Sequence, residues 1–302
     1  MPEGPEVRRY ALQLQNALET HEILHFSARN KAAKAYLLAH PGALVGRKIE
    51  KIRSHGKHLY GVFEGEIGFH SHLMTWGRWF VHEIAGTAHD SLEIDRRERA
   101  RLVVPSAVAV LFSAPVFEIF EGHPYEQIEN LRTLGPDVLP YDGVFESENF
   151  VARLTQNENL EREIGAVLLD QRVCAGIGNY FRADLLFLCG ISPFKTVREL
   201  SGEEIAALTR EIPLLAARSL EQPGVSVPPE MRARLLSEPQ LSYNERIVEW
   251  GARHATFRRT NLPCLRCGEK IKQKKQVVYR TPDGDAENEK SRVIYFCPNC
   301  QK

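Results

Sequence analysis

The chain of 302 residues lacks any long hydrophobic run, since no stretch approaches 18 consecutive apolar residues. A helix needs about 20 such residues to cross a bilayer, so we expect no transmembrane segment and no membrane partner. The chain start also lacks the apolar run of a secretory signal, because five charged side chains fall within its first twenty residues. We therefore expect the protein to work in the cytosol.

Net charge is missing as well, because 39 Lys and Arg residues balance 39 Asp and Glu residues. The balance hides an asymmetry. Residues 251–302 hold 12 basic and 5 acidic side chains, a net charge of +7, so the first 250 residues carry −7. A basic segment on an acidic body indicates a localised site for a polyanion. A solvated charged tail would give the same count, and charge by itself does not separate the two.

Cysteine is scarce, with six residues, and in a reducing compartment we expect no disulfides. Cys174 and Cys189 lie in apolar stretches and are expected in the core. The other four form two Cys-x2-Cys pairs with 29 residues between them, which can supply four sulfurs to one tetrahedral Zn²⁺. Four thiolates leave no open position for catalysis. We therefore expect one structural zinc ion per chain, held by Cys264, Cys267, Cys297 and Cys300, with the acidic segment 281–288 as a loop at the hairpin tip.

Apolar spacing divides the chain into a strand-rich first half and a helical second half. Apolar residues recur at helical spacing over 7–18, where Pro5 suits the first turn. Short β-branched and aromatic runs predict strands at 59–63, 67–73, 78–81, 101–104, 107–112 and 116–120. The later pattern predicts helices at 147–154, 161–171, 180–189 and 202–220, and a long loop at 222–245.

These patterns predict an α+β chain of several domains. We expect a β-sandwich behind a leading helix at 1–133, a linker at 134–145 around Gly135-Pro136, a helical domain at 146–258 and a zinc-finger hairpin at 259–302. The last segment has too little apolar area for a core of its own, so a metal would hold it together.

The start Met1-Pro2-Glu3-Gly4-Pro5-Glu6 can place a nucleophile at the N-terminus. Removal of Met1 leaves a proline whose nitrogen is a free secondary amine, partly uncharged at neutral pH. Its attack on an aldehyde-level carbon gives an iminium cation, which is an electron sink for elimination. Glu3 can donate or accept the proton that such chemistry needs. Most Met-Pro starts, however, have no function.

Two further features are compatible with phosphate binding. The turn at 171–180 joins two predicted helices, and its glycines let the backbone approach a partner while Asn179 is expected to N-cap the next helix. Arg292 lies five positions before Cys297, where a hairpin tip beside a metal can present it stiffly to a phosphate. A plain interhelical turn and a solvent-exposed arginine are the simpler interpretations.

The start motif, Gly56-Lys57, the 171–180 turn and the four-cysteine finger with Arg292 follow one another in an order that resembles the formamidopyrimidine-DNA glycosylase/endonuclease VIII family. The similarity runs along essentially the whole chain. It implies an N-terminal β-sandwich, a helix–two-turn–helix DNA-binding domain and a C-terminal zinc finger.

The resemblance implies a bifunctional enzyme of base excision repair, which removes oxidised bases from double-stranded DNA and cuts the strand at abasic sites by β,δ-elimination. Pro2 would be the Schiff-base nucleophile at sugar C1′, and Glu3 the general acid for base loss and ring opening. Lys57 would assist β-elimination, and Arg292 would bind the flanking phosphate and assist δ-elimination. Asn179 would hold a backbone phosphate.

Extrusion of a nucleotide leaves a gap in the duplex that a side chain must fill. In the family a loop between sheet strands supplies the fillers, which implies Met74, Thr75 and Trp76 here, although Thr75 stands where a larger apolar residue is usual. Burial in the sandwich core is the alternative for Met74 and Trp76. A linker arginine often touches DNA in the family, and Arg132 lies near that place, one residue out of register.

Gly4 and the approach at 168–171 resemble the endonuclease VIII branch, whereas the formamidopyrimidine branch usually has leucine at the position of Gly4. This implies oxidised pyrimidines as substrates, with oxidised purines as the alternative. A catalytically silent damaged-DNA-binding protein and a zinc-ribbon interaction protein are further alternatives. The presence of Pro2, Glu3 and Lys57 argues against the silent module. Glu6 matches a second carboxylate of the start motif without a clear role. We expect a monomer, cytoplasmic and associated with the nucleoid through DNA.

Overall fold

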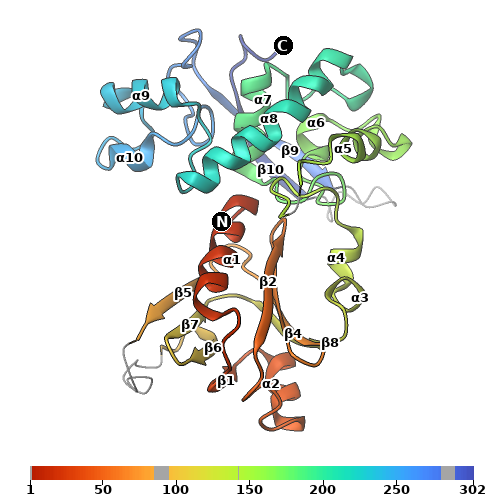
Figure 1. Cartoon of the computed structure of the whole chain (residues 1–302). Helices are drawn as coiled ribbons and strands as arrows, with labels where there is room; N and C mark the ends of the chain where they lie inside the picture. Colours follow the sequence, from red (N-terminus) through yellow and green to blue (C-terminus); the bar gives the residue numbers. More distant parts are fainter. Residues whose placement is uncertain (1, 85–94, 142, 280–289) are drawn as a thin grey trace. The chain divides into compact units, whose positions relative to one another are not determined.

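The computed structural model describes residues 2–84, 95–141, 143–279 and 290–302, which belong to two compact units, Met1–Thr133 and Leu134–Lys302. Figure 1 draws the first unit in red to yellow and the second in green to blue. Each unit has a hydrophobic core of its own. The sequence predicts a strand-rich first half and a helical second half, and each half has its own core in the structure.

The N-terminal unit is a sandwich of two four-stranded antiparallel sheets, ordered β1-β6-β7-β5 and β2-β3-β4-β8. The first sheet contains β1 (His25–Ala28), β6 (Glu98–Val104), β7 (Ala107–Phe112) and β5 (Arg78–Glu83). The second contains β2 (Ile49–His55), β3 (His58–Phe63), β4 (Ile67–His72) and β8 (Val116–Glu121). The helices of this unit are α1 (Gly4–Leu18), α2 (Lys31–Ala39), α3 (Pro124–Gln127) and α4 (Glu129–Thr133).

One apolar core fills the space between the two sheets and α1. Val7, Ala11 and Leu14 of the helix are buried in it, so the helical spacing predicted over 7–18 is that of a core-facing helix. The sheets contribute aromatic side chains such as Phe69 and Trp79, whose ring centroids lie 5.9 Å apart. The predicted α+β architecture, with a β-sandwich behind a leading helix, is confirmed.

The six predicted strands are all present, each within three residues of its predicted bounds, but β1, β2 and α2 were not predicted. In β2 the inward residues Ile49 and Ile52 are separated by exposed charged residues. A β-bulge between Ile49 and Lys51 explains this spacing, since an extra residue shifts the side-chain alternation by one. Alternation with period two, the signal sought in the sequence, is therefore broken in this strand.

The C-terminal unit is helical and ends in a two-stranded hairpin. Its α-helices are α5 (Ser147–Leu154), α6 (Ile164–Val167), α7 (Asn179–Cys189), α8 (Gly202–Glu221), α9 (Pro229–Ser237) and α10 (Val248–Gly251). Short 3₁₀ turns are η2 (Asn157–Asn159), η3 (Val197–Glu199) and η4 (Pro239–Leu241), and the hairpin pairs β9 (Lys272–Tyr279) with β10 (Lys290–Phe296). No helix within the described ranges has the length and hydropathy that a bilayer span requires.

Two predictions for this unit are wrong. The helix predicted at 161–171 shrinks to α6, because the chain turns at Asp170, whose carboxylate accepts the backbone N–H of Arg172 at 3.1 Å. The loop predicted at 222–245 contains α9 and η4. Pro229 begins α9, and a proline is tolerated there because a helix has no partner for its first N–H groups. The helices predicted at 147–154, 180–189 and 202–220 are present.

Candidate functional site

The first turn of α1 fixes the position of Glu3, the residue after Pro2. Glu3 is the N-cap of the helix and is only 2% exposed. Its backbone N–H donates to Oε2 of Glu6 at 2.9 Å, as in a capping box. This hydrogen bond satisfies a donor that the start of a helix leaves unpaired. Glu6, which had no clear role in the sequence, therefore orders the beginning of the chain.

Helix α1 and strand β2 run antiparallel, and this arrangement determines which residues lie beside the N-terminus. Near the beginning of the helix, Nε of Arg8 donates to Oγ of Ser54 at 3.0 Å. Just after its end, the backbone N–H of Thr20 donates to the carbonyl of Ile49 at 2.8 Å. The beginning of α1 therefore lies beside the end of β2, where the Gly56-Lys57 turn follows.

Lys57 lies in a tight turn between β2 and β3 that also adjoins the end of β4. Gly56 has a φ of 55°, in the left-handed region that glycine enters at little steric cost. His58, the next residue after Lys57, pairs with His72 at the end of β4. The Lys57 turn and the loop that follows β4 are therefore neighbours at one edge of this sheet.

The loop after β4 carries the predicted gap-filling residues on its surface. Met74 and Trp76 are 49% and 73% exposed, and Thr75 is exposed as well. The alternative of core burial for Met74 and Trp76 is thereby excluded. Met74 has a φ of 50°, a strained conformation for a residue with a side chain. Arg132, the predicted linker contact, is exposed on α4.

In the C-terminal unit, Asn179 begins α7 and binds the strand that carries Arg292. The N-cap is the glycine before it, so the N-cap role predicted for Asn179 is wrong. Its side-chain Nδ2 instead donates to the carbonyl of Val293 at 3.0 Å. Arg292 is the exposed third residue of β10 and pairs with Gln276. The predicted loop at 281–288 lies outside the described residues.

A buried arginine that the sequence analysis missed joins α7 to the same hairpin. Arg182 lies one helical turn after Asn179 and donates to its Oδ1 at 3.0 Å and to the carbonyl of Val293 at 3.2 Å. Its other terminal nitrogen donates to Oε1 of Gln276 at 2.9 Å. The signal in the sequence was a charged residue inside the apolar run 180–189, three positions after Asn179.

Gln276 anchors β9 through both ends of its amide. While Oε1 accepts from Arg182, Nε2 donates to Oε2 of Glu163 at 2.7 Å and to the carbonyl of Pro193 at 2.8 Å. The side chain is 2% exposed, so these bonds replace water. One glutamine thus fixes the hairpin to the segments on either side of it.

The turn at 171–180 is braced by a side chain and by the predicted linker. Gln171 Nε2 donates to two backbone carbonyls of the turn at 2.9 Å each, and its Oε1 accepts the backbone N–H of Gly176 at 3.0 Å. The start of the linker packs on this turn, because a Cβ added to Gly135 would lie 2.6 Å from the carbonyl oxygens of Arg172 and Val173. A residue with a side chain does not fit at position 135.

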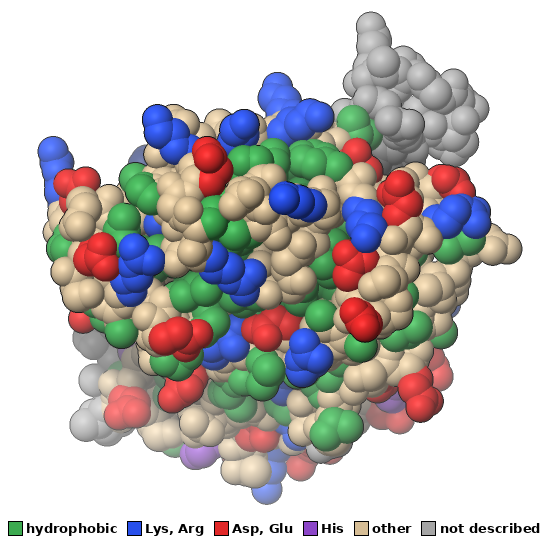
Figure 2. Space-filling view, turned by 90° about the horizontal axis from the view of Figure 1, so that it is seen from above, with side chains coloured by type: hydrophobic (Ala, Val, Ile, Leu, Met, Phe, Trp, Pro, Cys, Tyr) green, Lys and Arg blue, Asp and Glu red, His purple; other side chains and the backbone are tan. Residues whose placement is uncertain are grey.

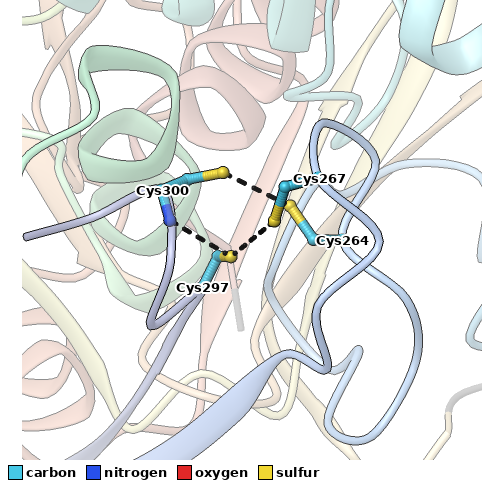
Figure 3. Close-up of side chains that lie close together, drawn as sticks. All are labelled: Cys264, Cys267, Cys297 and Cys300. Carbon is cyan, nitrogen blue, oxygen red and sulfur yellow. Dashed lines mark hydrogen bonds between the residues drawn. The ribbon is translucent and has the colours of Figure 1, made fainter.

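The four predicted zinc ligands converge at the end of the hairpin, with their sulfurs turned toward one another (Figure 3). All four sulfurs lie within 4.8 Å of one another, and the Cys264–Cys300 and Cys267–Cys297 pairs are 3.8 and 3.5 Å apart. Four sulfurs around a tetrahedral zinc with bonds of about 2.3 Å stand about 3.8 Å apart. The donor set and its spacing therefore fit one Zn²⁺.

The cysteine cluster is docked on α7 and shares a core with the segment around α9. Arg266 donates to the carbonyls of Phe187 and Leu188 at 2.7 and 2.9 Å, where cations complement the C-terminal end of a helix. Cys264 and Cys297 are buried in one apolar cluster together with residues of 225–255. The finger is therefore not an isolated appendage held by metal alone.

Surface charge does not by itself mark a nucleic-acid site. On the face that Figure 2 shows, Lys and Arg side chains are interspersed with Asp and Glu side chains and with apolar ones. The Lys and Arg side chains on this face therefore form no single basic patch. DNA binding must therefore depend on specific residues and not on net charge.

Comparison with known proteins places both units in one family. Residues 1–107 match the model of the formamidopyrimidine-DNA glycosylase N-terminal domain, and residues 134–240 match the formamidopyrimidine-DNA glycosylase H2TH domain. Endonuclease 8 of Klebsiella pneumoniae is 30% identical over 311 residues, and endonuclease 8 of an Enterobacter species is 28% identical over 309 residues. Both alignments cover 100% of this chain and of the relative.

Solved structures give the same fold at lower identity. Lactococcus lactis Fpg in complex with DNA that contains an abasic site matches with a TM-score of 0.73 and 18% identity, over 99% of both chains. The same enzyme with DNA that contains N7-benzyl-Fapy-dG matches with a TM-score of 0.72 and 19% identity, over 100% of both chains. The chain therefore belongs to the formamidopyrimidine-DNA glycosylase/endonuclease VIII family of DNA glycosylases with AP lyase activity.

Proposed function

We propose that this glycosylase and lyase of base excision repair acts on oxidised pyrimidines in double-stranded DNA, with Pro2 as its nucleophile. One observation carries the proposal. Pro2 directly precedes the buried N-cap Glu3, at the end of α1 that lies beside the Lys57 turn. An amine, a carboxyl group and an ammonium at one edge are the groups needed to form a Schiff base and to eliminate from it.

These residues act in sequence on the deoxyribose of the damaged nucleotide. Once Met1 is removed, the lone pair of the Pro2 nitrogen bonds to C1′, and the damaged base leaves with the electrons of its glycosidic bond. Glu3 donates a proton to O4′ as the C1′–O4′ bond breaks and the sugar ring opens. The amine proton passes to the departed base, and an iminium remains at C1′. Lys57 supports the sugar or phosphate while C2′ loses a proton and the 3′-phosphate departs.

We assign the DNA-phosphate contacts of the C-terminal unit to Asn179 and Arg292. The Asn179 amide carries a second N–H beside the one that binds Val293, and Arg292 is exposed on the adjacent strand. Arginine suits a phosphate because its guanidinium can bind two oxygens at once. Arg292 would then hold the phosphate that departs in δ-elimination.

Met74, Thr75 and Trp76 are assigned to the gap left by the extruded nucleotide, and Arg132 to the DNA backbone. The exposure of the first three supports this role, since a wedge has to reach the duplex before it can replace a base. An indole stacks well on bases, so Trp76 compensates for the small side chain of Thr75.

We further propose that Cys264, Cys267, Cys297 and Cys300 hold one structural Zn²⁺ per chain. Bound there, the ion would crosslink the two knuckles of the finger and take no part in the reaction, because four thiolates fill its coordination sphere. We also propose a monomer, because none of the assigned roles requires a second copy of the chain. Its DNA would be that of the nucleoid in the cytoplasm.

The preference for pyrimidines rests on the branch of the family. Gly4 and the segment 168–171 resemble endonuclease VIII, and the full-length relatives at 28–30% identity are named endonuclease 8. The fold alone does not choose, because the neighbouring Fpg structures include complexes with both formamidopyrimidine and oxidised-pyrimidine DNA. Oxidised purines are therefore the alternative.

Borohydride trapping tests the nucleophile and the substrate together. The protein is incubated with duplexes that carry thymine glycol, 8-oxoguanine or an abasic site, and borohydride is then added. We expect a covalent adduct, formed faster on thymine glycol than on 8-oxoguanine. A fusion whose N-terminal tag is cleaved to expose Pro2 should trap, and the uncleaved fusion should not. Binding without any adduct would leave the silent module, and equal trapping by the uncleaved fusion would rule out Pro2.

Arg292→Ala tests the assigned phosphate contact. We expect it to slow strand cutting more than base removal, because departure of a phosphate depends on the group that stabilises its charge. Lys272→Ala, which removes another exposed cation of the same hairpin, is the matched control. Equal losses of both activities in Arg292→Ala would contradict the assigned role.

A further inference from the structure

A line of hydrogen-bonded side chains crosses β3, β4 and β8 on the face of the sheet that points away from the core. His70 Nδ1 lies 2.6 Å from Oε1 of Glu118, and His70 Nε2 lies 2.9 Å from Nδ1 of His58. His58 and His70 are 7% and 2% exposed, whereas the side chain of Glu118 is 43% exposed. The line therefore leads from the surface to a buried imidazole.

The chemistry of these groups fixes where their protons lie. The hydrogen bond from His70 holds the pKa of Glu118 below its usual range, so the carboxylate is ionised and only accepts. His70 must then donate from Nδ1. In its neutral form His70 accepts at Nε2, which makes Nδ1 of His58 the donor. Nε2 of His58 consequently keeps its lone pair.

His58, at the buried end of the line, lies at the edge of the sheet that also holds the Lys57 turn of the proposed active site. The rings of His58 and His72 meet edge to face with centroids 4.8 Å apart, and Nδ1 of His72 accepts the backbone N–H of Met74 at 3.2 Å. Burial lowers the pKa of His58 to about 2, with repulsion from His70, His72, His55 and Lys57. Burial, with repulsion from His70 and Lys57, lowers the pKa of His72 to about 4. Both rings are therefore neutral near pH 7.

We propose that Glu118, His70 and His58 are positioning residues for the lyase step, which keep an uncharged imidazole with a fixed tautomer beside Lys57. This inference rests on the proposed role of Lys57. One added proton reverses the arrangement without breaking the line. The proton enters at Nε2 of His58, and the Nδ1 proton of His58 moves to Nε2 of His70, leaving an imidazolium paired with Glu118. His58 then presents an N–H donor to an edge that already holds the Lys57 ammonium.

The arrangement predicts how the lyase step depends on pH. We call the line from Glu118 to His58 the relay. The lyase step uses the relay without the added proton, so the rate of this step should fall as the pH is lowered and the relay takes up a proton. Glu118→Gln keeps an oxygen that can accept from His70 but removes the charge. A proton on the line then has no carboxylate to pair with, so the acid limb should move to lower pH.

The functional test uses the ratio of strand cleavage to borohydride trapping between pH 5 and 9. Both reactions need the unprotonated Pro2 amine, so its titration cancels in the ratio and the step after Schiff-base formation remains. We expect the acid limb of this ratio to move to lower pH in Glu118→Gln and to stay in place in Glu121→Gln. Glu121 lies on the same strand, three residues on, and accepts a hydrogen bond from Tyr36 outside the line. A ratio that ignores pH, or an equal limb in both variants, overturns the proposal.

Nitrogen-15 spectra of the histidines test the relay without any reaction. At pH 8, wild-type His58 and His70 should each carry their proton on Nδ1, with assignments from His58→Phe and His70→Phe. A His58 protonated on Nε2 at that pH overturns the relay. Failure of the proposed function would be recognised by a different result. The wild-type protein would then give no trapped adduct with DNA, whichever tautomers the spectra show.

Discussion

Replacing Glu6 by alanine should disturb the reaction more than the fold. The change removes the acceptor for the backbone N–H of Glu3, an interaction of about 1 kcal/mol for a helix cap. Unfolding entropy is about 2.1 cal/mol/K per residue, so for the 133 residues of the N-terminal unit this loss lowers Tm by about 3–4 °C. The rest of α1 should remain in place because Val7, Ala11 and Leu14 are buried in the core.

Loss of the hydrogen bond between Glu3 and Glu6 also lowers the fraction of molecules in which the first turn of α1 is ordered. A change of about 1 kcal/mol is a factor of about five, so borohydride trapping by Glu6→Ala should slow by up to about fivefold. Glu6→Gln, which retains a side-chain oxygen that can accept from Glu3, should trap within about twofold of wild type. Calorimetry and the trapping rate are measured on both variants. Unchanged trapping by Glu6→Ala alongside the expected fall in Tm would refute a link between the cap and the nucleophile.

Three further predictions concern the finger, the loop and pH. Cys267→Ser should lose bound zinc, measured by elemental analysis, and lower the Tm of the C-terminal unit, whereas Cys189→Ser should retain the metal because Cys189 lies outside the cluster. Trp76→Ala should leave Tm within about 1 °C, since the ring is 73% exposed, but slow base excision about tenfold; excision at the wild-type rate would assign the gap to another residue. The free energy of unfolding in urea should fall as the pH drops from about 6.5 toward 4, because His58 and His72 stay neutral in the folded state and take up protons when unfolded; His58→Phe should flatten this fall, and an unchanged slope would contradict it.

Elements with one uninterrupted period were predictable from the sequence. The helix predicted at 202–220 is present as Gly202–Glu221, with Ser201 as its N-cap and Glu204 completing a capping box. The strand predicted at 107–112 has the same bounds in the structure because its residues are apolar and largely buried. Strand β2 was missed because its bulge breaks the alternation, and α9 was missed because its first residues are proline and charged groups.

The candidate site was predictable where its residues are neighbours in the sequence, as the two Cys-x2-Cys pairs are. The capping box of Glu3 and Glu6 was not predicted, because glutamate is not among the usual N-cap residues and Glu3 had been assigned to catalysis. The line from Glu118 to His58 spans three strands, and His58 and His70 are twelve residues apart. Only strand register brings such residues together, and register depends on turns and bulges that composition does not reveal.

The buried amide of Gln276 has a consequence for how this chain can diverge over evolution. Its oxygen faces a guanidinium and its nitrogen faces a carboxylate and a carbonyl, so the site needs an acceptor and a donor at the two ends of one short group. Glutamate there would confront Glu163 with a second negative charge, and lysine would confront Arg182 with a second positive one. Lineages that share this hairpin should therefore keep an amide at this position while the exposed lysines around it drift freely.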